Sequence, residues 1–169
     1  MDLQQSTMTL RMVNIKGLFS KLERTIRDAA KSVGKKVVCE ISGGEQELDK
    51  GLVDQLSDPL IHMVRNAVDH GLEDSLQRLE RGKTDVGRVS LLARREGGSF
   101  VIEVRDDGRG LNPEVIREKA IEKGLISPLD VLSEKEIFDF IFENGFSTKG
   151  QVSELSGRGV GMNVVKEMI

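Results

Sequence analysis

Apolar residues in the first part of the chain recur with a helical period. Between Leu10 and Val33 they are spaced by three and four positions, which predicts an amphipathic helix ended by Gly34. The recurring positions are Leu18, Leu22, Ile26, Ala29 and Val33. From Lys36 to Ile41 the chain is rich in Val and Ile and then turns polar and glycine-rich, so we expect a short strand followed by a turn.

A second helical pattern extends from Leu48 to His70. Asp58-Pro59 lies inside it and predicts either a kink or a fresh helix start at that point. Gly71 follows directly, and we expect it to take the left-handed conformation that ends many helices.

Two alternating segments follow, Arg88 to Arg95 and Ser99 to Arg105, joined by Gly97-Gly98. This pattern predicts a β-hairpin with one apolar face. That face would carry Val89, Leu91, Ala93, Phe100, Ile102 and Val104.

The last third predicts two helices, from Pro113 to Lys123 and from Glu134 to Phe142, and a final helix from Met162 to Ile169. Between them, the stretch from Asn144 to Arg158 is rich in Gly and Ser and has no period, so we expect a mobile loop.

Composition narrows the class of protein. A chain of 169 residues with 38% hydrophobic and 31% charged residues is expected to form one folded domain. The net charge of -3 gives no basic surface for nucleic acid, and no apolar run is long enough for membrane insertion, so a cytoplasmic protein is expected. The single cysteine, Cys39, lies in the first predicted strand and is interpreted as a packing residue.

The second helix has a polar edge formed by His62, Asn66 and His70 beside its apolar row. An Asn amide oxygen is a neutral hard ligand, and Mg²⁺ keeps most of its shell as water and phosphate oxygen, so Asn66 is a candidate magnesium ligand. The alternative is a polar stripe that only meets solvent. A zinc site is disfavoured, because Asn66 stands between His62 and His70 on this edge.

Asp106 ends the second hairpin strand and is followed by Gly108 and Gly110. Glycines let a flat ring approach the backbone while the carboxylate accepts a hydrogen bond from an amino group such as that of adenine. The alternative is an ordinary Asp-Gly turn.

A third candidate segment is the glycine cluster Gly157, Gly159 and Gly161 before the last helix. Unpaired backbone N-H groups at a helix start favour phosphate, and Lys149 and Arg158 could add charge. The alternative is a flexible connector. The spacing fits neither a Rossmann fingerprint nor a P-loop.

Together these segments resemble the ATP-binding domain of the GHKL superfamily, and within it the catalytic domain of the CheA family of chemotaxis histidine kinases. The run from His62 to Glu73 is similar to the family's N box, and Asp106 to Gly110 to its first glycine box. Gly145 to Thr148 resembles the lid, and Ser156 to Met162 the second glycine box. The resemblance covers residues 10–169, which leaves 1–9 as the remnant of a preceding segment.

The resemblance implies a Bergerat-type α/β (α+β) two-layer sandwich, a mixed sheet with helices on one face. It implies catalytic roles for His62 and Asn66, with Asn66 on Mg²⁺, His70 and His62 on the phosphate side, and Asp106 on the adenine amino group. The residues expected to bind ATP are Asn66, Asp69, His70, Asp106, Gly108, Gly110, Phe146, Ser147, Gly157, Gly159, Val160, Gly161 and Met162.

Relatives in this family continue past the last helix with a glycine turn and two further strands, which this sequence lacks. We therefore expect an unpaired sheet edge and lower stability than in a version extended through those strands. Equal melting temperatures of the two versions would refute this expectation.

Superfamily members that hydrolyse ATP carry Glu at the position of His62. The resemblance instead implies transfer of the γ-phosphoryl group to a histidine on a separate phosphotransfer domain, with a receptor array and a response regulator reached through other domains. Two alternatives stay open: a GHKL ATPase that couples hydrolysis to conformational change, and a non-catalytic nucleotide-binding module of a signalling array.

Overall fold

The computed structural model describes residues 11–143 and 146. They fall into two compact units that divide between Arg109 and Gly110. Each unit has its own cluster of buried apolar side chains. The expected boundary at residue 10 lies outside the described residues.

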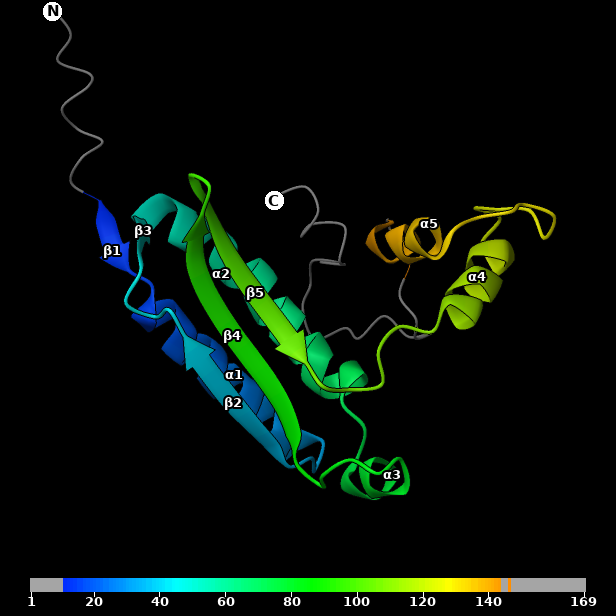
Figure 1. Ribbon diagram of the computed structural model, residues 1–169, viewed down its shortest axis with the longest axis horizontal. Coiled ribbons are helices and arrows are strands. Elements are labelled where there is room, and N and C mark those ends of the chain that lie inside the picture. Colours follow the sequence, from blue (N-terminus) through cyan, green and yellow to red (C-terminus); the bar gives the residue numbers. More distant parts are fainter. Residues whose placement is uncertain (1–10, 144–145, 147–169) are drawn as a thin grey trace, which may run out of the picture. The chain divides into compact units, whose positions relative to one another are not determined.

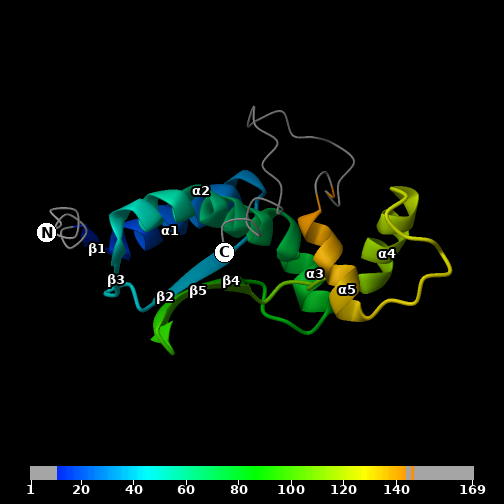
Figure 2. The same cartoon turned by 90° about the horizontal axis from the view of Figure 1, so that it is seen from above.

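The first unit is a mixed α/β sandwich of two layers. Its elements are β1 (Met12–Asn14), α1 (Lys16–Ser32), β2 (Val37–Ser42), β3 (Glu47–Asp49), α2 (Lys50–Asn66), the π-helical turn η1 (Ala67–Gly71), α3 (Ser75–Glu80), β4 (Gly87–Glu96) and β5 (Ser99–Asp106). In the three-stranded sheet β4 is central, parallel to β2 and antiparallel to β5. Helices α1 and α2 lie side by side on one face of this sheet (Figures 1 and 2). The expected two-layer fold is confirmed, and its sheets are open.

The core of this unit follows the apolar periods of the sequence. In α1 the residues at helical spacing, Leu18, Leu22 and Ile26, are at most 6% exposed. In β4 the alternate residues Val89 and Leu91 are at most 1% exposed. Burial of one such side chain stabilises the fold by roughly 1.5–3 kcal/mol. The apolar face of each helix or strand therefore packs on the core.

The predicted hairpin is confirmed. Gly97 and Gly98 have φ values of 55° and 87°, the conformation that a tight two-residue hairpin turn requires at both positions. The ladder then pairs Leu91 with Val104 and Ala93 with Ile102, so the apolar residues of both strands share the face that packs on the core.

The start of the chain corrects the first predicted helix. It begins at Lys16 and not near Leu10, because Met12–Asn14 forms β1 and pairs antiparallel with β3. Strands of three residues are too short for alternation to be visible in the sequence.

The second predicted helix also begins slightly later. Leu48 belongs to β3, and α2 begins at Lys50, where the Asp49 carboxylate accepts hydrogen bonds from the backbone N-H groups of Gly51 (2.8 Å) and Leu52 (3.3 Å). Because α2 continues through Pro59 without a break, the fresh start considered at Asp58-Pro59 is wrong.

Cys39 lies in β2 and packs partly buried against the core, as expected. Burial, together with the nearby Glu23 carboxylate, raises the pKa of its thiol to about 11.

The second unit contains α4 (Pro113–Glu122), α5 (Glu134–Asp139) and the 3-10 turn η2 (Phe140–Phe142). Both helices have N-terminal caps: Asn112 accepts from the N-H of Glu114 at 2.9 Å, and Ser133 and Glu136 form a reciprocal capping box. Their buried cluster consists of Ile116, Ala120, Ile137 and Phe146. The two helices predicted here are confirmed.

The remaining predicted elements, residues 1–9, the loop 144–158 apart from Phe146, and the final helix 162–169, lie outside the described residues. Within the described part, no helix is both long and apolar enough to cross a bilayer.

Candidate functional site

Helix α2 places His62 and Asn66 at the boundary between core and surface. Leu60 and Val64 of the same helix are at most 6% exposed and hold it against the core. His62 and Asn66 are half-buried, as the predicted polar edge requires.

His62 carries a neutral imidazole at pH 7. Burial lowers its pKa below the ordinary 6.5, and the nearby charges of Arg65 and His70 lower it further. A neutral imidazole beside Asn66 can accept or donate one hydrogen bond without adding positive charge.

The last turn of this helical segment is a π-helix, Ala67–Gly71, in which the N-H of Leu72 donates to the carbonyl of Ala67 at 2.8 Å. The ammonium of Lys35 donates to three carbonyl oxygens at its end, those of Val68 (2.7 Å), Asp69 (2.9 Å) and Leu72 (2.8 Å). Single π turns inside helices are frequent at functional sites. This turn carries Asp69 and His70, so Lys35 fixes the backbone of two predicted site residues.

The end of this π turn and the start of the Asp-Gly turn are in direct contact. The N-H of Arg109 donates to the carbonyl of Gly71 at 2.9 Å, and the N-H of Gly108 donates to Asp106 Oδ1 at 2.9 Å. A Cβ at Gly108 would lie 2.1 Å from Gly71 O and 2.7 Å from Asp106 Oδ1. The two segments that the sequence singled out separately thus form one corner, with Asp106 exposed at it.

The reason for a glycine at position 71 differs from the prediction. Gly71 does not have a positive φ, so the expected left-handed helix end is wrong. A Cβ at this position would lie 3.2 Å from Asp106 Oδ1. A Cβ here would make a tight contact, and the Asp106 carboxylate would have to shift by a few tenths of an ångström to accommodate it.

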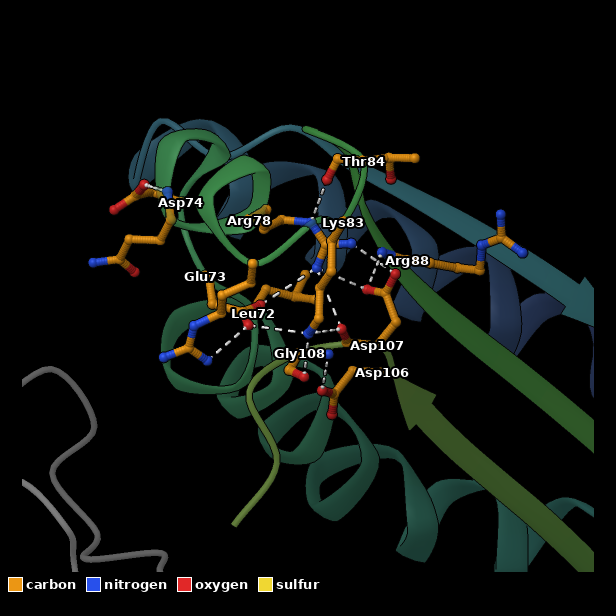
Figure 3. Close-up of polar contacts among 12 residues, drawn as sticks. Leu72, Glu73, Asp74, Arg78, Lys83, Thr84, Arg88, Asp106, Asp107 and Gly108 are labelled. Carbon is orange, nitrogen blue, oxygen red and sulfur yellow. Dashed lines mark hydrogen bonds and ion pairs between the residues drawn. The ribbon is translucent and has the colours of Figure 1, made fainter. Parts of the chain in front are cut away.

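An ionic cluster with two buried members, Glu73 and Arg78, lies beside this corner and has no counterpart in the sequence analysis. Glu73 and Arg78 are 2% and 1% exposed, and together with Lys83 and Asp107 they form hydrogen-bonded ion pairs (Figure 3). Burial by itself would raise the pKa of Glu73, but hydrogen bonds from its own backbone and from Lys83, and the charges of Lys83 and Arg78, lower it below its ordinary value.

The pKa of Asp107 is likewise lowered. Burial opposes this shift, but the hydrogen bonds from Arg78 and from the backbone N-H of Arg88 outweigh it. In the sequence, the only indication of such a cluster is a Glu and an Arg five positions apart. Charged residues usually lie on a solvated surface, so their burial could not be predicted.

Asp69 and Gly110 are two further residues that the sequence predicts to bind nucleotide. Asp69 lines a hollow of about 250 Å³ together with Asp28, Ser32 and Arg65, and this hollow contains none of the other predicted site residues. Gly110, with φ +71°, belongs to the second unit. Their roles in nucleotide binding stay predictions.

Phe146 is 5% exposed and belongs to the apolar cluster of the second unit. Its ring centroid lies 6.3 Å from that of Phe140, and its N-H donates to the carbonyl of Glu143 at 3.0 Å. Its predicted contact with nucleotide is not tested by this packing. The predicted site residues Ser147, Gly157, Gly159, Val160, Gly161 and Met162 lie outside the described residues.

The donor chemistry at α2 fits a magnesium ion that keeps phosphate and water in its shell. Asn66 would supply one amide oxygen from a half-buried position, and one protein ligand is enough for Mg²⁺ bound with a nucleotide. Among the residues that the structure describes, no three His, Cys, Asp or Glu side chains gather as a metal cage.

A mixed sheet covered by helices on one face, with a polar helix edge ending beside an exposed carboxylate and two glycines, fits a domain that binds a nucleotide. The comparison with protein families agrees. Residues 55–169 match the family described as histidine kinase-, DNA gyrase B- and HSP90-like ATPase, and the chain belongs to that family. It is an ATP-binding domain.

Curated relatives are similar over 99% of this chain. The chemotaxis protein CheA of Borreliella burgdorferi is 48% identical over 168 residues, which are 19% of that protein. The sensor histidine kinase CheAY of Helicobacter pylori is 47% identical over 170 residues, 21% of its length. The chemotaxis protein CheA of Bacillus subtilis is 44% identical over 170 residues, 25% of its length. The chain thus spans 19–25% of the length of these relatives.

Proposed function

We propose that the chain is the ATP-binding catalytic domain of a chemotaxis histidine kinase, which binds Mg-ATP and transfers the γ-phosphoryl group to a histidine on a separate phosphotransfer domain. The relatives named chemotaxis protein CheA and sensor histidine kinase support this. The observation on which the proposal depends most is the corner where the exposed Asp106 carboxylate lies against Gly71 and Gly108.

Each residue has a separate role in this proposal. Asp106 accepts a hydrogen bond from the adenine amino group, which gives selectivity for the base. Asn66 holds Mg²⁺, which would neutralise charge on the phosphates. His62, neutral at pH 7, lies beside the phosphates without a charge of its own.

The transfer itself breaks the bond between the γ-phosphorus and the oxygen that bridges it to the β-phosphate. A bond to a nitrogen of the acceptor imidazole forms, and ADP leaves. A neutral imidazole is already nucleophilic near pH 7, so the domain contributes position and electrostatic stabilisation more than proton abstraction.

The acceptor is supplied in the experiment as a separate phosphotransfer domain. Labelled ATP, Mg²⁺ and this domain are mixed with the chain, and label on the acceptor histidine is followed over time. Asn66→Ala is expected to lose most transfer and the Mg²⁺ dependence of ATP binding. Full transfer by Asn66→Ala would overturn the metal assignment, and no ATP binding by calorimetry at millimolar nucleotide would overturn the proposal.

The two alternative functions have their own outcomes in the same assay. A GHKL ATPase would release inorganic phosphate at the same rate with and without the acceptor domain. A non-catalytic module would bind ATP and leave it intact in both mixtures. The receptor array, the response regulator and the cytoplasmic location expected from the sequence stay predictions.

A further inference from the structure

Asp106 and Asp107 are adjacent carboxylates with opposite surroundings. Asp107 faces the buried cluster, where its carboxylate accepts from both terminal nitrogens of Arg78, at 3.1 and 2.7 Å, and from the N-H of Arg88 at 2.8 Å (Figure 3). Among the described residues no cation pairs with Asp106, whose carboxylate accepts from the N-H of Gly108. Successive residues at a strand end point to opposite sides. The Asp107 carboxylate is therefore bound within the protein, and the Asp106 carboxylate is available to a ligand.

The backbone after Asp106 is held by one side chain in particular. The ammonium of Lys83 donates to the carbonyls of Asp107 (2.9 Å) and Gly108 (2.8 Å), and to Glu73 Oε1 at 3.0 Å. Three acceptors match the three protons of an ammonium group. Lys83 therefore fixes the Asp107–Gly108 and Gly108–Arg109 peptide units.

Arg78 completes the support from the interior. Its Nε donates to the carbonyl of Thr84 at 2.8 Å and its Nη1 to the carbonyl of Asp107 at 3.3 Å. The guanidinium is planar and rigid, and at 1% exposure it is locked by packing as well as by hydrogen bonds. The same Asp107 peptide is thus held from two directions.

We propose that Lys83 and Arg78 are positioning residues for base recognition: they fix the Asp107 and Gly108 peptides so that the Asp106 carboxylate keeps one orientation at the corner with Gly71. Neither residue touches the nucleotide. The proposal rests on the proposed function, in which Asp106 accepts from the adenine amino group. It predicts that loosening the turn weakens recognition of the amino group more than binding of the rest of the nucleotide.

The test compares ATP with inosine triphosphate, which has an oxygen in place of the amino group. Lys83→Met keeps the length of the side chain and removes its three donors. We expect ATP affinity to fall about tenfold and inosine triphosphate affinity to change less than about threefold, because a loosened acceptor loses discrimination at the amino group alone. Calorimetry on the full chain gives both affinities.

Arg81→Met is the matched control. Arg81 lies two residues from Lys83 and donates to Glu73 Oε1 at 3.3 Å, so it shares the cluster and the charge. No hydrogen bond from it to the Asp107 or Gly108 carbonyl is present among the described contacts. The ratio of the two affinities should stay as in the wild type, whereas Lys83→Arg, which keeps donors near both carbonyls, should recover most of the ratio.

Equal losses for both nucleotides in Lys83→Met would overturn the proposal, because they indicate a general loss of structure. A normal ratio in Lys83→Met would overturn it as well. If the wild type itself does not prefer ATP to inosine triphosphate, the role of Asp106 fails, and this is seen before any variant is made. Arg78→Lys adds a second variant, expected to lower the ratio in the same direction.

Discussion

Gly108 shows most directly how single residues set the geometry of the site. The space where a Cβ would stand is already taken by the carbonyl of Gly71, 2.1 Å away, and by Asp106 Oδ1 at 2.7 Å. Real Cβ atoms do not approach backbone oxygen this closely, so any other residue must move the Asp106 turn away from the end of the helix.

Gly108→Ala is expected to reduce ATP affinity by more than tenfold and to lower the free energy of unfolding by about 2 kcal/mol, since overpacked sites respond with shifts of this cost. Calorimetric titration and urea unfolding measure the two effects. Gly17→Ala is the control, because a Cβ there, in the first turn of α1, meets nothing within 4 Å. Wild-type affinity in Gly108→Ala would mean that the turn does not shape the site.

The sequence predicted the candidate residues Asp106 and Gly108 but gave a wrong reason for Gly71. A left-handed helix end depends on neighbouring residues and can be predicted from them. The close approach of Gly71 and Asp106 joins positions 35 residues apart, so it depends on the fold. The same limit applies to Glu73 and Arg78. Their burial depends on Asp107 and Lys83, which only the folded chain brings to them.

At the scale of elements, the π turn Ala67–Gly71 depends on a residue from another part of the chain. Lys35 follows α1 and donates to three carbonyls of the turn and of the residue after it. Carbonyls at a helix end have no partner within the helix, so this ammonium replaces the hydrogen bonds they would otherwise make with water.

Lys35→Met should lower the free energy of unfolding by about 2 kcal/mol, the scale of hydrogen bonds made by a charged donor. It should also weaken ATP binding, because the turn carries Asp69 and His70. Lys31→Met, at an exposed position in the last turn of α1, is the control and should change stability by less than about 0.5 kcal/mol. The same small change in Lys35→Met would contradict a supporting role.

Long elements with a clear apolar period were predictable, and short ones were not. The main part of α1, β2 and the β4–β5 hairpin follow patterns of six or more residues that packing on one core reinforces. In contrast β1 and β3 have three residues each, and α3 has six with Leu76 and Leu79 exposed. Such elements are held by pairing and by caps such as Asp74, which accepts from the N-H of Gln77 at 2.9 Å.

For the whole chain, two separate apolar clusters predict two units of folding stability. One lies between the helices and sheet of residues 11–109, and the other gathers α4, α5 and Phe146. A small cluster supplies little stability by itself, so the second unit is expected to open more readily than the first.

Ile116→Ala, in the second cluster, should destabilise that unit by roughly 2–5 kcal/mol through the cavity it leaves. Native-state hydrogen exchange should then show faster exchange of the amides of α4 and unchanged exchange in β4. Equal acceleration in β4 would show that the chain opens as one unit.

Acid stability of the chain should depend on the ion pairs of the buried Glu73 and the more exposed Asp107. Both pKa values are lowered in the folded protein, so the unfolded chain takes up protons first as the pH falls. The stabilising contribution is complete well above pH 4.5, the ordinary value for Glu73, and is lost as the pH decreases through the folded pKa.

Glu73→Gln should therefore be less stable than the wild type at pH 7 and lose less stability between pH 6 and pH 3. Urea unfolding across this range, at constant ionic strength, gives both curves. Parallel curves would show that the Glu73 carboxylate does not contribute to acid sensitivity.

The partly buried thiol of Cys39 has a practical use in spectroscopy. Because burial raises its pKa to about 11, little thiolate is present at pH 7, and maleimide dyes react with it slowly. A cysteine introduced at Val131, which is 98% exposed, would be modified selectively without removal of the native one. Fluorophores attached there can report on the helical unit while the β2 strand keeps its natural side chain.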